Sequence, residues 1–139
     1  MTANPLRGTE MELSPAPRIL IVDDQPDLRL LVRLTFEGQG YEVNEAATGE
    51  AALAACASRA PDAVLLDVMM PGIDGYEVCR RLKADPHLGR TLVVLMTAGH
   101  QETERVRASE AGADVYVAKP FSPAQLLELV RSGLASRLA

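Results

Sequence analysis

The chain has 139 residues, of which 47% are apolar, and this length and composition suit one well-cored domain and exclude wholesale disorder. The net charge of −5 disfavours direct binding to nucleic acid, because neutralising phosphates requires clustered Lys and Arg side chains. No apolar run approaches the ~18 residues of a membrane span and no signal-peptide core is present, so we expect a cytoplasmic protein without a membrane partner.

The N-terminal segment differs in composition from the remainder of the chain. Residues 1–17 carry three prolines and no hydrophobic periodicity, which predicts a flexible leader. We therefore expect one folded domain over residues 18–139. No linker or effector domain follows the last predicted helix. The sequence leaves open whether the domain is a stand-alone protein or part of a longer one.

The first predicted unit is a strand followed by a helix. Arg18 to Val22 is a short apolar run that predicts a strand. Pro26 opens a helical pattern, since proline suits the first turn of a helix, and Gly38 and Gly40 close it. We expect the inner stripe of this helix to consist of Leu28, Leu31, Leu34 and Thr35.

The next elements continue the alternation. Glu42 to Ala46 places one apolar side chain between polar neighbours, a pattern typical of an edge strand. Thr48 suits the N-cap of an Ala-rich helix that runs to about Arg59. The unbroken apolar run from Ala63 to Leu66 predicts a strand that is buried on both faces.

The C-terminal half repeats this pattern. A helix is predicted from about Asp74 to Ala84, and a continuous apolar strand from Thr91 to Met96. We expect the helix from about Gln101 to Ala111 to be weakly anchored, because Val106 is its only large apolar residue. A fifth strand is predicted from Asp114 to Ala118. The last helix is marked by Leu126, Leu127, Val130, Leu134 and Leu138.

Five strands that alternate with five helices predict an α/β fold with a doubly wound, five-stranded parallel sheet. Right-handed crossovers then place helices on both faces of the sheet. Ligands of such folds bind outside the carboxyl ends of the strands, at the switch in strand order. The residues that terminate the predicted strands are therefore the candidates for a functional site: Asp23, Asp24, Asp67, Thr97 and Lys119.

These residue types together indicate phosphoryl chemistry. Two carboxylates 4 Å apart repel by about 4 kcal/mol at an effective dielectric constant of 20, so three of them require a cation. Lys119 supplies one charge and leaves a net negative site that suits Mg²⁺, which binds through a few carboxylates plus phosphate oxygens. A carboxylate is also a competent nucleophile toward phosphorus. Lys119 and the Thr97 hydroxyl can then bond the phosphoryl oxygens.

Five short stretches carry a resemblance to a known family. They are Ile21-Val22-Asp23-Asp24, Leu65-Leu66-Asp67-Val68-Met69-Met70-Pro71-Gly72-Ile73-Asp74-Gly75, Met96-Thr97-Ala98, Ala111-Gly112-Ala113-Asp114 and Lys119-Pro120-Phe121. With this set, the chain from about Arg18 to Leu138 resembles response regulator receiver domains of bacterial two-component systems, of the single-domain, chemotaxis-regulator type. The resemblance implies a flavodoxin-like sheet with the strand order 2-1-3-4-5.

The resemblance also implies an acceptor and a metal site. Asp67 corresponds to the phosphoacceptor of the family. Asp23 and Asp24 correspond to residues that hold Mg²⁺, together with Asp67 and the main-chain carbonyl of Met69. The expected cofactor is therefore Mg²⁺.

The remaining motif residues correspond to the switch of the family. The resemblance implies that Thr97 is the switch hydroxyl, that Lys119 pairs with the phosphate and that Tyr116 is an aromatic rotamer switch. It further implies a cis peptide between Lys119 and Pro120. The alternative for Tyr116 is an ordinary edge-strand aromatic whose hydroxyl lies in water.

The implied function is that of a phosphoacceptor receiver. It takes a phosphoryl group from a sensor histidine kinase or phosphotransfer protein and switches the binding of a downstream protein target. We expect self-phosphorylation and slow autodephosphorylation rather than enzymatic turnover. Hydrolysis is expected to be slow because Met69 and Gly99, which line the approach of water in such domains, offer no polar group to orient it.

Three other functions compete with this reading. A phosphatase with an aspartyl nucleophile usually has a second Asp two positions further on, where this chain has Met69. A nucleotide-binding module lacks its main feature, since no G-x-G-x-x-G or P-loop follows the first strand. An unphosphorylated interaction domain of receiver shape is disfavoured by the acidic pair, Thr97 and Lys119.

Overall fold

The computed structural model describes residues 15–99 and 101–138, so residues 1–14 of the predicted leader lie outside the described residues. The strands are β1 (Arg18–Val22), β2 (Glu42–Ala46), β3 (Ala63–Asp67), β4 (Leu92–Thr97) and β5 (Val115–Ala118). The helices are α2 (Pro26–Glu37), α3 (Gly49–Ser58), α4 (Gly75–Ala84), α5 (Glu102–Glu110) and α6 (Pro123–Leu138), with a short 3₁₀ helix η1 (Pro86–Leu88).

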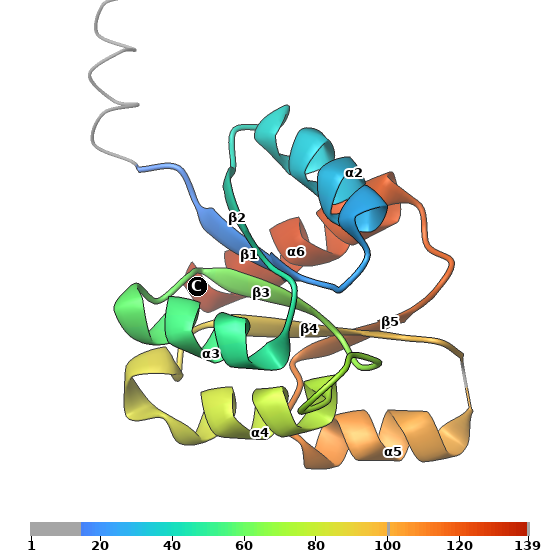
Figure 1. Ribbon diagram of the computed structural model, residues 1–139. Coiled ribbons are helices and arrows are strands. Elements are labelled where there is room, and N and C mark those ends of the chain that lie inside the picture. Colours follow the sequence, from blue (N-terminus) through green and yellow to red (C-terminus); the bar gives the residue numbers. More distant parts are fainter. Residues whose placement is uncertain (1–14, 100, 139) are drawn as a thin grey trace, which may run out of the picture.

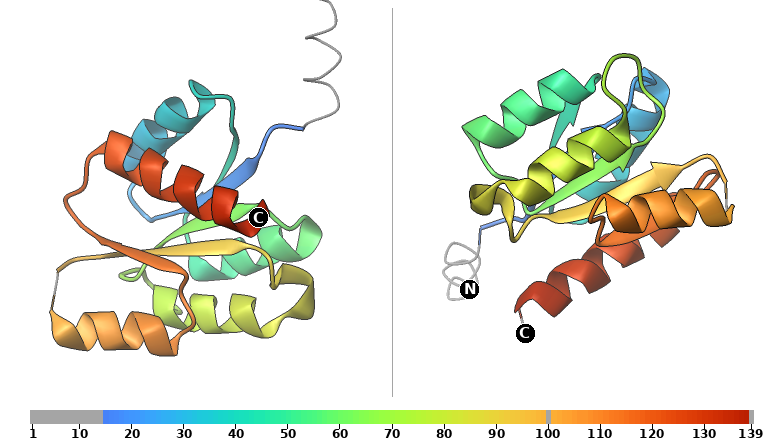
Figure 2. Two further views of the ribbon diagram at one scale, coloured as in Figure 1. Left: turned by 180° about the vertical axis from the view of Figure 1, so that it is seen from behind. Right: turned by 90° about the horizontal axis from the view of Figure 1, so that it is seen from below.

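The strands form one parallel sheet in the order β2-β1-β3-β4-β5, which confirms the predicted order. Helices α2 and α6 cover one face of the sheet, and α3, α4 and α5 cover the other (Figures 1 and 2). The chain turns from β1 outward to β2 and then crosses back to β3, so the switch in strand order lies between β1 and β3. The carboxyl ends of these two strands therefore frame the expected binding site.

The central strands are buried on both faces, as their unbroken apolar runs predicted. Every residue of β3 and β4 is buried. Successive side chains of a strand point to opposite faces, so Leu65 packs with the cluster beneath α2 and α6, and Leu66 packs with the cluster beneath α3 and α4. Each fully buried side chain of this size stabilises the fold by roughly 1.5–3 kcal/mol relative to an exposed one.

Helix α2 buries a different face from the predicted one. Its fully buried side chains are Val32 and Phe36, and the Phe36 ring meets the edge of Tyr41 with centroids 5.2 Å apart. The predicted stripe is therefore wrong at Leu31 and Leu34, which are 46% and 61% exposed. The physical reason is the helical period of 3.6 residues, because leucines spaced by three drift around the helix and away from the sheet.

Helix α5 has the fewest buried side chains among the described α-helices. Ala108 is its only buried residue, and Val106 is exposed. The expectation of a weakly anchored helix is thus confirmed at the level of packing. Few buried apolar contacts give a segment a low local stability, so α5 is the helix most easily displaced. Within the described residues, none of the helices combines the length and the apolarity that crossing a bilayer requires.

Candidate functional site

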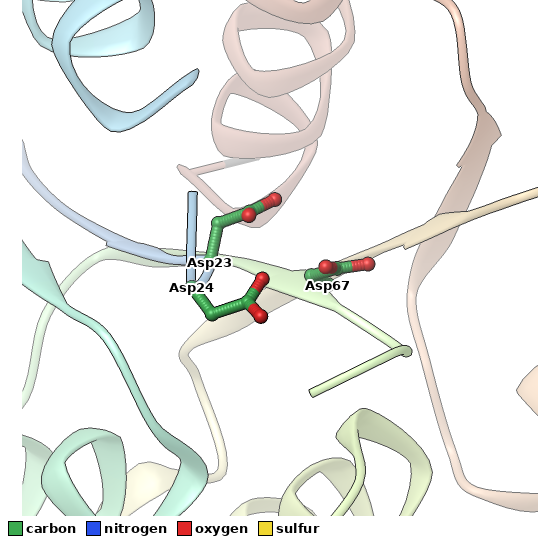
Figure 3. Close-up of side chains that lie close together, drawn as sticks. All are labelled: Asp23, Asp24 and Asp67. Carbon is green, nitrogen blue, oxygen red and sulfur yellow. The ribbon is translucent and has the colours of Figure 1, made fainter. Parts of the chain in front are cut away.

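Three carboxylates gather at the carboxyl ends of β1 and β3. Val22 pairs with Leu66 in adjacent strands, so the residues that follow them, Asp23 and Asp67, are neighbours. One oxygen each from Asp23, Asp24 and Asp67 can be chosen so that all three lie within 4.8 Å of one another (Figure 3). Asp23 is completely buried and Asp67 is 5% exposed, whereas Asp24 is exposed. The structure therefore brings together the acidic residues that the strand-end argument selected.

Lys119, the residue that follows the edge strand β5, also joins the cluster. Its Nζ lies 3.0 Å from Oδ2 of Asp23 and 3.4 Å from Oδ2 of Asp67. Its backbone is held at the same rim, because its N–H donates to the carbonyl of Thr97 over 2.7 Å. The Lys119–Pro120 peptide is cis, as the resemblance implied. One ammonium against three carboxylates leaves the site net negative.

The electrostatics of Asp67 show this excess of negative charge. Burial raises the pKa of Asp67 above its ordinary value, and the charge of Asp23 raises it further, while Lys119 opposes both. A divalent cation among these oxygens would offset both effects. The donor set consists of carboxylate oxygens at a partly open rim, which fits Mg²⁺ and its preference for oxygen ligands and retained water. Residues Asp23, Asp24 and Asp67 are therefore able to hold that ion.

The segment after β3 fixes the orientation of the Asp67 carboxylate. The N–H of Met69 donates to Oδ1 of Asp67 over 3.2 Å, which leaves Oδ2 facing Lys119. The Met69 side chain points outward and is 70% exposed. Behind Asp67, helix α4 begins at Gly75, whose N–H donates to the carbonyl of Val68 over 3.1 Å.

Gly75 has a role that the sequence analysis did not assign. A Cβ atom at this position would lie 2.7 Å from Cα of Val68 and closer still to the carbonyl oxygen of Asp67. The first turn of α4 can thus approach the chain behind Asp67 only because this residue lacks a side chain. The signal in the sequence is the Asp74-Gly75 pair, because Asp74 caps the helix by accepting from the N–H of Glu77 over 2.9 Å.

The two predicted switch residues lie on the neighbouring strands β4 and β5. Thr97 is completely buried, and its hydroxyl donates to the carbonyl of Gly99 over 2.9 Å. The hydroxyl proton is therefore directed at the loop that leads to α5. Tyr116 is half-buried on β5 and packs against the apolar cluster beneath α3 and α4. Thr97 ends β4 and therefore borders the segment that leads to α5.

Comparisons with known proteins indicate the family to which the chain is related. The family model of the response regulator receiver domain matches residues 19–131. The phosphate regulon transcriptional regulatory protein PhoB of Rhizobium meliloti (strain 1021) is 41% identical over 118 residues, which are 85% of this chain and 52% of that protein. The transcriptional regulatory protein ResD of Bacillus subtilis (strain 168) is 38% identical over 122 residues, which are 88% of this chain and 50% of that protein. This chain thus spans about half the length of these relatives.

A solved structure is similar over most of its length. The signal receiver domain of a signal transduction histidine kinase from Syntrophus aciditrophicus superposes with a TM-score of 0.82 and 34% sequence identity. The superposition covers 87% of this chain and 92% of the other. The likeness therefore extends over most of both chains.

Proposed function

We propose that Asp67 takes the phosphoryl group in this chain. The chain belongs to the response regulator receiver family and is a phosphoacceptor domain of a two-component system. The observation that carries this assignment is the position of Asp67 between Asp23, Asp24 and Lys119. It is the carboxylate that both lies in the acidic cluster and ends a central strand of the sheet. The donor is a sensor histidine kinase or a phosphotransfer protein.

The same carboxylates form the proposed metal site. Asp23, Asp24 and Asp67, with the main-chain carbonyl of Met69, hold Mg²⁺. When bound, the ion supplies positive charge against the phosphoryl oxygens. Hydrogen bonds within the protein hold the Asp23 carboxylate in place at this site. Oδ1 of Asp23 accepts from the N–H of Gln25 over 2.9 Å, and its Oδ2 accepts from Lys119.

Transfer uses the ionised Asp67 as the nucleophile. One of its carboxylate oxygens forms a bond to phosphorus, the bond from phosphorus to the imidazole nitrogen of the donor breaks, and the electron pair stays on that nitrogen. Lys119 already lies 3.4 Å from Asp67, where its ammonium can donate to a phosphoryl oxygen. The product is an acyl phosphate on Asp67.

The switch follows from the hydrogen bond that Thr97 makes in this structure. Its hydroxyl donates to the carbonyl of Gly99, and a phosphoryl group of about −1.5 to −2 charge on Asp67 is a stronger acceptor. Turning the hydroxyl toward that group breaks its bond to Gly99 and frees the loop before α5. Helix α5 can then move, because Ala108 is its only buried side chain. Tyr116 then turns into the vacated space. The change shifts a pre-existing equilibrium and alters the surface offered to a downstream protein target.

The remaining expectations belong to the same proposal. The folded domain extends over residues 18–139 behind a leader of residues 1–17, and the protein acts in the cytoplasm. It phosphorylates itself from small donors and loses the group slowly, because the exposed Met69 thioether is a poor partner for the attacking water. The domain itself has no nucleic acid or membrane as a direct partner.

Acetyl phosphate tests the assignment of the acceptor. Intact mass spectrometry should show one added phosphoryl group with Mg²⁺, and none with EDTA or in Asp67→Asn. Asp27→Asn is the control, since Asp27 is an exposed carboxylate in the first turn of α2 and should leave labelling unchanged. Full labelling of Asp67→Asn would show that another residue is the acceptor. Steady release of phosphate without a stoichiometric adduct would indicate a phosphatase instead.

A further inference from the structure

We infer that Arg29 is a positioning residue for the acidic pair, because its guanidinium braces the main chain of Asp23 and thereby sets the geometry of Asp23 and Asp24. This inference rests on the proposed function, since it concerns the residues proposed to hold the metal. The sequence alone indicates no role for Arg29. Among the described residues, its hydrogen bonds and ion pair go to the Asp23 carbonyl and to Glu45, and none goes to a carboxylate of the acidic cluster.

The Arg29 side chain connects three segments of the fold. Its Nη1 donates to the carbonyl of Asp23 over 2.8 Å, and its Nε donates to Oε1 of Glu45 over 2.8 Å. Glu45 lies on β2, where it pairs with Ile21 of β1. The guanidinium is planar and its donors have fixed directions, so satisfying both acceptors fixes where the carbonyl of Asp23 lies relative to β2.

The turn that carries the acidic pair has other restraints, but none of them acts on the Asp23 carbonyl. The Asp23 N–H donates to the carbonyl of Ala46 over 3.2 Å, and the Asp23 carboxylate accepts from Gln25 and Lys119, whereas the bond to the Asp23 carbonyl comes from Arg29. Strand β1 ends at Val22 and helix α2 begins at Pro26, so Asp23 and Asp24 lie in the turn between them. Gln25, the N-cap of α2, makes no side-chain capping bond, and Pro26 has no N–H to donate. The close carboxylates also repel one another before a cation binds. This repulsion, which Lys119 offsets only in part, favours separation of the two side chains, so a fixed main chain at Asp23 helps to keep them together.

Arg33 provides a matched comparison on the same helix. Its Nε donates to Oε2 of Glu45 over 2.6 Å, and its Nη1 donates to Glu37 over 2.7 Å. Arg29 and Arg33 therefore share one carboxylate and carry the same charge, but the bond to the Asp23 carbonyl comes from Arg29. Removing either arginine leaves Glu45 with one guanidinium partner. A difference between the two variants then reports the brace and not the loss of a positive charge.

The test compares Arg29→Gln, Arg29→Lys and Arg33→Gln. The dissociation constant of Mg²⁺ is measured by calorimetry, and hydrogen exchange at the Gln25 amide is measured in the metal-free protein, because that amide donates to Asp23. Arg29→Gln should weaken Mg²⁺ binding about tenfold, the lower range for residues that orient metal ligands, while Arg33→Gln stays within about twofold of the parent. Exchange at Gln25 should accelerate in Arg29→Gln and not in Arg33→Gln.

Arg29→Lys is a second test of whether the geometry of the guanidinium or only its positive charge matters. Lysine keeps the charge but presents one compact ammonium that cannot serve both acceptors in the directions of the fork, so it should bind Mg²⁺ more weakly than the parent and more tightly than Arg29→Gln. It also carries the test if Arg29→Gln fails to fold. Equal weakening in Arg29→Gln and Arg33→Gln, or parent-like binding and exchange in both Arg29 variants, would overturn the inference. Absence of Mg²⁺ binding by the parent would overturn the proposed metal site instead, and exchange at Gln25 would then decide the brace alone.

Discussion

Replacing Gly75 by alanine should damage both the stability of the fold and the acceptor site. The new Cβ would lie 2.7 Å from Cα of Val68, whereas non-bonded carbons prefer about 3.5 Å or more, so the start of α4 and the chain after β3 must separate by nearly 1 Å. The opposing atoms are backbone, including the Asp67 carbonyl, and cannot rotate away. Overpacking of this kind costs about 1–3 kcal/mol, and the better helix propensity of alanine returns less than about 1 kcal/mol.

We therefore expect Gly75→Ala to lower the free energy of unfolding by about 2 kcal/mol. With a slope near 2 kcal/mol per molar urea, the unfolding midpoint should fall by about 1 M. Because a displacement of 1 Å can cost about 100-fold in rate, labelling by acetyl phosphate should slow by up to that factor. Gly89→Ala is the control, since its Cβ would meet the Pro86 carbonyl oxygen at 3.6 Å, an ordinary contact distance. A parent-like midpoint and labelling rate in Gly75→Ala would refute the reasoning.

Three further predictions concern pH, lifetime and switching. Burial alone would raise the pKa of Asp114, but hydrogen bonds from a backbone amide and from Lys83 outweigh it and hold the pKa below its ordinary value. The stability that this carboxylate contributes is thus present above its unfolded pKa of about 3.9 and is lost as the pH falls through the folded pKa, so urea midpoints should fall more steeply below about pH 4 in the parent than in Asp114→Asn. Met69→Asn should shorten the lifetime of the phosphoryl form several-fold after donor removal and Met69→Leu should not; equal decay of the two variants would mean that this side chain does not position the water. Thr97→Ala should still accept a phosphoryl group. Beryllofluoride should change hydrogen exchange in α5 strongly in the parent and in Thr97→Ser, and much less in Thr97→Ala.

The fold and the location of the site could be predicted because they depend on strong local patterns. Unbroken apolar runs indicate central strands, and β3 and β4 are buried throughout. Parallel strands bring their carboxyl ends to one edge, so Asp23, Asp67 and Lys119 converge although they lie far apart in the chain. The observed strands β3 and β4 each end one residue later than predicted, which leaves this argument unchanged.

Features that depend on the rotation of a helix or on close approach of two segments could not be predicted in this way. Leu31 and Leu34 were placed on the buried face of α2, but the sheet contacts the face of Val32 and Phe36. The same rotation directs Arg29 at the Asp23 carbonyl, which no local pattern indicates. The direction of a side-chain hydroxyl is likewise a tertiary property, because it depends on which acceptors surround it.

Trapping of the phosphoryl group tests the central claim most directly. Borohydride reduces an aspartyl phosphate to homoserine, so peptide mapping after labelling with acetyl phosphate and Mg²⁺ identifies the acceptor by its change in mass. The account predicts homoserine at position 67, and none at Asp23 or Asp24, the two carboxylates that share its cluster. Homoserine at either of those positions, or at any other Asp while residue 67 stays unmodified, would contradict the assignment of Asp67 as the phosphoacceptor.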